Sequence, residues 1–470
     1  MWVVSLCLAV ATLLYYARWA YKWRNPRCSG VLPPGSMGLP LIGETLELLI
    51  PSYSLDLHPF IRKRMGLGFN PIVNITYGPI FRTSLIGQPI IISVDSKFNN
   101  HILQQEGRLV EIWYLDTIAK LFALEGESRL SRVGLVHKYI RRIFLNHFGS
   151  DILREKLLQQ IEEGVERCLR KWSSQPCIEV KEAAFAMMFD FAGRQLFSFL
   201  AFPLNVPGTA YHRCLKEHRK FIDMLKDTLR ERLNSGKTSN VDFLDEAIDS
   251  MHDQDFLTED FMVQMMFVGI FASSETISSM LAMIFKLLSG TPAVLEELRG
   301  QSTALCWDEY KSMTFTMQVT QNPFTEIFIS MPSMLQRRIM FRDVRVLFEK
   351  KLMVINETLR LANFAPWLLR RAVQDIPVNG FMIPKGWSIM AVTTALHTNH
   401  DVFENPLEFN PWRWKCVGAE YTRAFLCAFL HVSVTKFRWT EIKVGDVYRN
   451  YVLCFKDGIK IKILELGKSL

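Results

Sequence analysis

Two groups of residues in this chain could do chemistry: an acid–hydroxyl pair and a cysteine. Glu275 and Thr276 lie within 261–288, a segment that is otherwise nearly apolar and is followed by a Gly-Thr-Pro stop. A carboxyl and a hydroxyl group on a buried helix can hold a water molecule and relay protons through it. Cys416 stands just before 419–431, which reads as a helix, and a helix N-terminus stabilises a thiolate. The pair is therefore a candidate for proton transfer, and the cysteine is a candidate for thiolate chemistry.

Each group also has a plainer interpretation. A core helix can carry a few hydroxyl groups without any function. Residues 261–288 could instead cross a bilayer as part of a two-pass membrane scaffold, but Glu275 disfavours this because an ionisable group at bilayer depth is costly. A small buried cysteine is a common structural residue, and that alternative stays open for Cys416.

A possible ion-pair network follows the apolar segment. Glu357 and Arg360 are spaced i and i+3, so they share one face of a predicted helix. Alone, such a pair is usually a solvated salt bridge. A second arginine, Arg413, lies within 409–414, Phe-Asn-Pro-Trp-Arg-Trp.

Taken in order, these motifs resemble the cytochrome P-450 family of heme-thiolate monooxygenases. The resemblance is carried by Glu-x-x-Arg at 357–360, Phe-x-Pro-x-Arg-Trp at 409–414 and Cys-x-Gly at 416–418. It implies a heme b cofactor whose iron is bound by Cys416, with the acid–hydroxyl pair as the proton relay for dioxygen cleavage. It also implies that the Glu–Arg–Arg set is a buried folding network.

The same resemblance assigns three basic residues to the heme propionates. His137 and Arg141, at i and i+4, match the family helix that grips these carboxylates, and Arg370 matches a further contact. Cations suit a partly buried pair of carboxylates. Basic residues on an exposed surface remain the alternative for all three.

The chain departs from the family pattern in three places. Only Lys415 stands between Trp414 and Cys416, where the family has a Phe-x-x-Gly-x-Arg turn that cradles the thiolate. Two peptide steps reach at most about 7 Å, which is too short for that turn. Residues 197–200 occupy the place of a helix that covers the substrate pocket. Residues 320–354 interrupt a helix without clear periodicity, and we interpret them as an insertion that resembles translated intron sequence.

The N-terminal residues predict a membrane anchor. Trp2 to Ala17 is apolar apart from two hydroxyl residues, and basic residues follow it. About 20 such residues span a bilayer as a helix, and positive charge on this flank predicts a cytoplasmic body. A cleaved signal peptide would need a basic start and small residues at its exit, and this sequence has neither. We therefore expect a single-pass anchor over 1–24 and a stiff, proline-rich hinge over 25–43.

Residues 44–470 read as one mainly α domain with small peripheral β-sheets, as in the cytochrome P-450 fold. Apolar residues three and four apart predict an amphipathic helix over 150–172. Two β-like runs over 80–94 predict a hairpin. The dipeptide Asp457-Gly458, between two alternating runs, predicts a second hairpin near the C-terminus.

Composition limits the partners and the compartment. The chain has 470 residues, of which 49% are hydrophobic, and its net charge of +8 is scattered. Scattered charge argues against nucleic acid and suits acidic membrane lipid or an acidic redox partner. Nine cysteines without framework spacing indicate a reducing compartment.

The implied function is that of an enzyme anchored in the endoplasmic reticulum membrane, with electrons supplied by NADPH-cytochrome P-450 reductase. Stretches 202–211, 367–372 and 409–414 are similar to the plant clan of brassinosteroid, gibberellin-precursor and triterpenoid oxidases. The implied substrate is an apolar terpenoid or sterol-like small molecule, contacted by segments such as 364–367 and 451–453. The open alternative is a catalytically inactive relative, or the product of an incorrectly joined transcript, that binds no heme.

Overall fold

The structure of the protein is a computed structural model. It describes residues 2–24, 28–39, 42–66, 77–113, 158–188, 210–235, 248–249, 251, 257–299, 342–413, 420–449 and 453–466.

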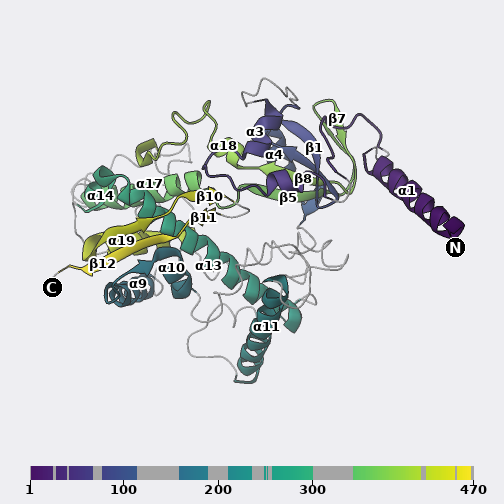
Figure 1. Ribbon diagram of the computed structural model, residues 1–470. Coiled ribbons are helices and arrows are strands. Elements are labelled where there is room, and N and C mark those ends of the chain that lie inside the picture. The colour runs from purple at the N-terminus through teal and green to yellow at the C-terminus, as the bar shows by residue number, and fades with distance from the viewer. Residues whose placement is uncertain are drawn as a thin grey trace, which may run out of the picture.

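Helices dominate the described residues, as Figure 1 shows. In chain order they are α1 (Trp2–Arg24), α2 (Thr45–Leu48), α3 (Pro59–Met65), α4 (Ser96–Gln104), α9 (Leu158–Ser173), α10 (Val180–Met188), α11 (Ala210–Ser235), α13 (Glu259–Ser289), α14 (Pro292–Arg299), α17 (Arg342–Ala362), α18 (Thr394–His397) and α19 (Glu420–Lys436), with a short 3-10 helix, η4 (Pro411–Arg413). The mainly α content with small sheets confirms that part of the predicted fold class. The predicted helix over 150–172 is present as α9 from Leu158 onward, and its earlier residues lie outside the described ranges.

The largest sheet among the described residues has five strands in the order β1-β2-β8-β5-β3. Its strands are β1 (Ile80–Leu85), β2 (Gln88–Ser93), β3 (Val110–Ile112), β5 (Trp367–Ala372) and β8 (Ser388–Val392). β1 and β2 pair antiparallel, which confirms the hairpin predicted over 80–94. The smaller sheets are made of β4 (Ile178–Glu179), β12 (Ile459–Glu465) and β9 (Phe437–Val444), of β10 (Val447–Arg449) and β11 (Leu453–Phe455), and of β6 (Ile376–Val378) and β7 (Phe381–Ile383).

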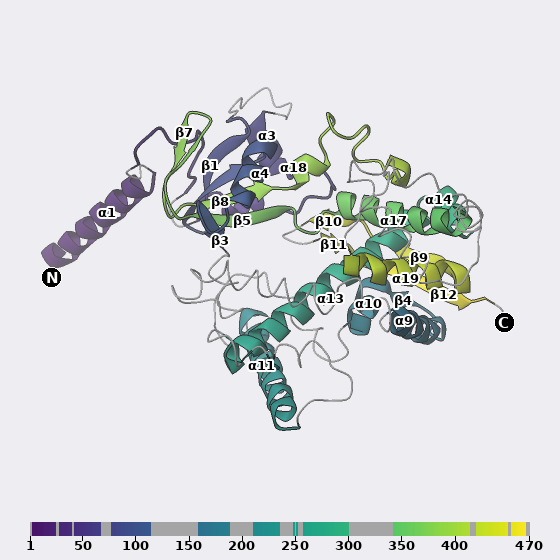
Figure 2. The ribbon, with the colours of Figure 1, turned by 180° about the vertical axis from the view of Figure 1, so that it is seen from behind.

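The long helix α13 crosses the middle of the molecule (Figures 1 and 2). In Figures 1 and 2 the five-stranded sheet lies toward α1, and α9, α10, α14 and α19 gather at the opposite end. Thr258 caps the start of α13, because its side chain accepts a hydrogen bond from the backbone N–H of Phe261. The apolar residues of its C-terminal half, such as Leu281 and Phe285, are buried in the main core together with Phe429 of α19. The helix predicted over 261–288 is therefore confirmed, with its C-terminal half packed inside protein.

One part of the sequence interpretation is wrong. The described strands on either side of Asp457-Gly458 do not pair with each other: β11 pairs with β10, and β12 pairs with β9 and β4. The turn itself forms, with positive φ at both residues. Its neighbours across the sheets are residues of 437–449, and the backbone N–H of Gly445 donates to Gly458 O at 2.9 Å. Antiparallel pairing of 437–449 with 453–465 thus replaces the hairpin expected at Asp457-Gly458.

The structure describes part of 320–354, which we interpreted as an insertion without clear periodicity. Residues 342–354 form the first part of α17, continuous with the turn that carries Glu357 and Arg360. Eight of these 13 residues are arginine, lysine, leucine, methionine or glutamate, which are good helix formers. Val354 is 1% exposed and belongs to the main core. The end of the predicted insertion is therefore part of the helical core, and residues 320–341 lie outside the described ranges.

This arrangement buries a lysine at the interface of α17 and α19. Lys351 is 1% exposed, and its Nζ lies 2.7 Å from Nδ1 of His431. Burial, with the charges of Lys351 and Lys436, lowers the pKa of His431 to about 3. His431 is thus a neutral hydrogen-bond acceptor in the folded core.

The predicted anchor segment is helical, as α1. Of the helices in the described ranges, none is by itself both long and apolar enough to cross a bilayer; the bent pair 274–289 and 292–299 meets that requirement only jointly. The transmembrane role of 1–24 stays a prediction.

Candidate functional site

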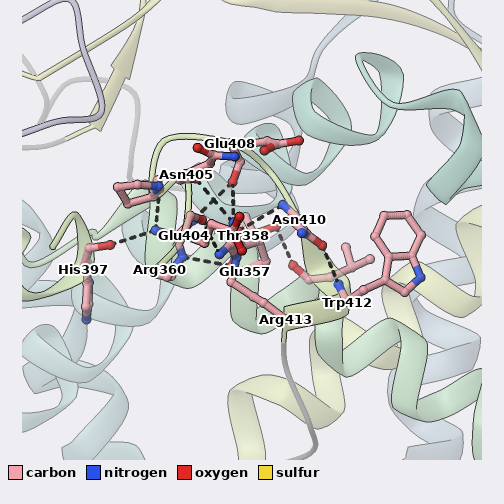
Figure 3. Close-up of polar contacts among 12 residues, drawn as sticks. Glu357, Thr358, Arg360, His397, Glu404, Asn405, Glu408, Asn410, Trp412 and Arg413 are labelled. Carbon is pink, nitrogen blue, oxygen red and sulfur yellow. Dashed lines mark hydrogen bonds and ion pairs between the residues drawn. The ribbon is translucent and has the colours of Figure 1, made fainter. Parts of the chain in front are cut away.

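A buried ion pair joins Glu357 and Arg360 on one face of α17 (Figure 3). The guanidinium of Arg360 donates from Nε to Glu357 Oε2 at 2.9 Å and from Nη2 to Oε1 at 2.7 Å. The side chain of Glu357 is 0% exposed and that of Arg360 is 1% exposed. A two-point contact of this kind is the strong form of the arginine–carboxylate interaction.

Arg413 completes the network from η4. Its Nε donates to Glu357 Oε1 at 3.1 Å, and the backbone N–H of Asn410 donates to the same oxygen at 3.1 Å. Arg360 also donates to the carbonyl oxygens of His397 and Pro406, at 2.7 and 2.6 Å. Figure 3 shows how these bonds tie α17 to the loop 397–413. The structure thus brings together all three residues of the expected network, with Glu357 and Arg360 buried and Arg413 13% exposed.

Arg360 and a second buried arginine, Arg449 of β10, affect the pKa of a neighbouring histidine. His397 contributes its backbone oxygen to Arg360, and its ring is largely buried. Burial first, and then the charges of Arg360 and Arg449, lower the pKa of His397. The imidazole is therefore held neutral beside the network.

A second polar group lies in the middle of α13. Glu275 Oε1 accepts hydrogen bonds from Lys181 Nζ at 2.8 Å and from Ser279 Oγ at 3.2 Å. Glu275 Oε2 and Ser274 Oγ are buried and have no hydrogen-bond partner among the described residues. Thr276 follows on the same helix and is partly exposed. Buried polar atoms without partners are uncommon, and they are typical of places that receive a further polar group.

Sequence reasoning missed Lys181. It lies in the first turn of α10, 94 residues before Glu275, and no local motif distinguishes it. Its Nζ also donates to the carbonyl oxygen of Leu453 on β11, at 3.5 Å. Only the packing of α10 and β11 against α13 brings these residues together.

Arg370 lies on β5, between β8 and the edge strand β3 of the five-stranded sheet. Its Nη2 forms an ion pair with Glu106 Oε2 at 2.9 Å, and its Nη1 donates to the carbonyl oxygen of Leu369. Its Nε is buried without a partner among the described residues. The Nε–H of Arg370 is therefore a donor that can serve a second acceptor while Nη2 keeps Glu106.

Three of the expected residues lie outside the described ranges: Cys416, His137 and Arg141. The chain on either side of Cys416 is described. Arg413 ends η4 in the buried network, and Glu420 begins α19.

Two of the expected substrate-contacting segments meet beside α13. Phe364, just after α17, packs in one apolar cluster with Leu453 of β11 and Met283 of α13. Leu453 is also the residue whose carbonyl oxygen accepts from Lys181. Leu453 of β11 therefore contacts both the apolar cluster with Phe364 and, through its carbonyl oxygen, the lysine that binds Glu275.

Comparison with known proteins gives the family. A sequence model described as cytochrome P450 matches residues 195–322 and 352–425, and the unmatched interval between them falls within 320–354. A cucurbitadienol 11-hydroxylase from Siraitia grosvenorii is 40% identical over 513 positions, covering 98% of this chain and 99% of that protein. A beta-amyrin 16-alpha-hydroxylase from Maesa lanceolata is 38% identical over 520 positions, covering 100% of both chains.

The fold has a matching solved structure. The retinoic acid-bound cyanobacterial CYP120A1 superposes with a TM-score of 0.70 at 20% identity, covering 93% of this chain and 100% of that chain. The alignments with the two plant hydroxylases span more positions than the 470 residues present here, so those proteins contain residues that this chain lacks. Identity of this level over nearly the full length of both chains means that this chain belongs to the cytochrome P450 family.

Proposed function

We propose that this protein is a heme-dependent monooxygenase that hydroxylates an apolar terpenoid or sterol-like substrate, using dioxygen and electrons from a reductase. The observation that carries the proposal is the polar group on α13: a buried carboxylate oxygen of Glu275, the residue before Thr276, has no partner in the part of the chain that the structure describes. The family and the fold imply a heme iron cofactor. The substrate class is supported by the relatives, which act on cucurbitadienol and beta-amyrin.

The described residues fit that cofactor on the side of α13. Ser274 Oγ and Glu275 Oε2 are buried polar atoms that need a partner, as expected beside bound dioxygen and water. The Nε–H of Arg370 has no partner among the described residues, which suits a propionate oxygen. When bound, heme supplies an iron that activates dioxygen. Cys416 would hold the iron through its thiolate, and His137, Arg141 and Arg370 would hold the propionates.

Side chains of the protein would then deliver protons and line the substrate site. Glu275 and Thr276 would hold a water molecule and pass protons to the reacting oxygen. Phe364 and Leu453 would contribute apolar surface for the substrate skeleton. Glu357, Arg360 and Arg413 would act at a distance, by fixing the loop that leads toward Cys416.

Replacement of the relay residues gives the direct test. In Glu275→Gln and Thr276→Ala, we expect product formation to fall about 100-fold, because proton delivery by a positioned group contributes at least that much. The assay is conversion of cucurbitadienol or beta-amyrin by microsomes that contain the chain and a plant reductase, with products identified by mass spectrometry. Full conversion by both variants, with wild-type activity present, would contradict the relay.

We further infer that α1 anchors the enzyme in the endoplasmic reticulum membrane, beside its reductase. Leu13, Leu14 and Tyr15 are 70%, 66% and 68% exposed, which is unfavourable in water and favourable in lipid. Recovery of the chain in sedimented microsomes, and its loss from them when residues 1–24 are removed, would support this anchor.

One observation favours the alternative of an inactive relative that binds no heme. Only Lys415 stands between Trp414 and Cys416, and the plant relatives contain residues that this chain lacks. Sequencing the transcript across 319–355 and 414–416 separates the two. A transcript that encodes the missing Phe-x-x-Gly-x-Arg turn would mean that the active enzyme is a longer chain.

A further inference from the structure

The Glu275 carboxylate is held by a residue from another helix. Lys181 Nζ lies 2.8 Å from Glu275 Oε1, and the two side chains are 22% and 14% exposed. The second oxygen, Oε2, is buried and has no partner among the described residues. The carboxylate is therefore asymmetric: Oε1 accepts from two donors, Lys181 and Ser279, while Oε2 accepts from none of the described groups.

The lysine itself is fixed by the fold. α10 packs along α13 through Ala184, which lies in the main core with Ile277. The Lys181 ammonium also donates to Leu453 O on β11, at 3.5 Å. Attachment to both α13 and β11 restricts the lysine, and an ion pair sheltered from water is stronger than an exposed one. Without this cation, the carboxylate of Glu275 could rotate about its last bond.

We propose that Lys181 is the positioning residue for Glu275: it binds one carboxylate oxygen and thereby directs the other toward the proton relay. The relay belongs to the proposed function, on which this inference rests. The contact between Lys181 and Glu275 can be tested without any bound heme.

A nearby thiol reports on the pair. Cys454 follows Leu453 on β11 and lies opposite Tyr448 of β10. Burial raises the pKa of Cys454, Lys181 and Tyr448 lower it, and Glu275 raises it. Because the thiolate is the reactive form, its alkylation rate follows these charges.

The first experiment measures alkylation of Cys454 by iodoacetamide in the full-length chain, followed by peptide mass spectrometry. Lys181→Met should slow the reaction roughly threefold, and Glu275→Gln should speed it by a similar factor, because each removes one opposite charge near the thiol. Lys181→Arg should keep the wild-type rate. The matched control is Lys226→Met, which removes a lysine paired with Asp260 at 3.0 Å near the other end of α13 and should change nothing.

Opposite shifts in Lys181→Met and Glu275→Gln would support the pair, since loosened packing would expose the thiol and accelerate both variants. Equal shifts in one direction, or no shift, would overturn it. The second experiment uses heme-loaded enzyme and measures hydroxylated product per dioxygen consumed. This ratio should fall severalfold in Lys181→Met and recover in Lys181→Arg; failure of the arginine to restore it would overturn the positioning role. Absence of heme in every variant, wild type included, would instead count against the proposed function, and the alkylation rates would still decide the pairing.

Discussion

Glu357→Gln is expected to lower the free energy of unfolding by about 3 to 5 kcal/mol, because it leaves the charge of a buried arginine uncompensated. Arg360 is 1% exposed at its side chain, and Glu357 is the one carboxylate that binds it among the described residues. The same change weakens the bond from Arg413 and the backbone bond from Asn410. Urea unfolding followed by circular dichroism would measure the loss.

The chain offers a matched control in Glu296 and Arg299 on α14. This pair has the same i, i+3 spacing, with Nη1 of the arginine 2.9 Å from the carboxylate, but Glu296 is 71% exposed. Glu296→Gln should cost about 0.5 kcal/mol or less, because water already solvates this carboxylate. Similar losses in the two variants would contradict a special role for the buried network.

His431→Gln is expected to make the protein less sensitive to acid. In the folded chain the pKa of His431 is about 3, whereas its ordinary value is 6.5. Between these values the unfolded chain binds a proton that the folded chain does not, so stability falls as the pH falls below about 6.5, by about 1.4 kcal/mol per pH unit. Glutamine keeps an acceptor for Lys351 but does not titrate.

The measurement is urea unfolding at pH 7.5 and pH 5.5 for both proteins. Wild type should lose about 1.4 kcal/mol more than His431→Gln between these conditions. His58, His218 and His397 also have pKa values lowered by burial, so some acid sensitivity with the same sign should remain in the variant. Equal losses in the two proteins would contradict a neutral buried His431.

The sequence predicted those elements that depend only on residues close together in the chain. The apolar run of α13, the β1–β2 hairpin and the i, i+3 spacing of Glu357 and Arg360 each follow from residues close together in the chain. The third member of the network, Arg413, needed the family resemblance, because nothing local links it to a residue 56 positions earlier.

Contacts between distant segments were not predictable. Lys181 and Glu275 are 94 residues apart, and Lys351 and His431 are 80 residues apart. Each pair depends on how helices pack, which a single sequence does not encode in any short motif. The hairpin predicted at Asp457-Gly458 is wrong for the same reason. The turn forms, but the strands beside it pair with distant strands from 437–449.

The same distinction applies to the predicted insertion. Sequence alone marked 320–354 as foreign to the family pattern, and the family model also leaves 323–351 unmatched. The structure nevertheless continues α17 through 342–354, because helix formers next to an existing helical turn extend it at little cost. A segment that interrupts the family sequence can therefore still contribute to the core.

The central claim is that this chain binds heme through Cys416, and the reduced, carbon monoxide-bound absorption spectrum tests it most directly. The full-length chain would be expressed with heme precursor, beside Cys416→Ala and, as a control, Cys454→Ala. The account predicts a thiolate-type Soret band in wild type and in Cys454→Ala, and its loss in Cys416→Ala. A wild-type chain that folds but shows no heme absorption would contradict the proposed monooxygenase.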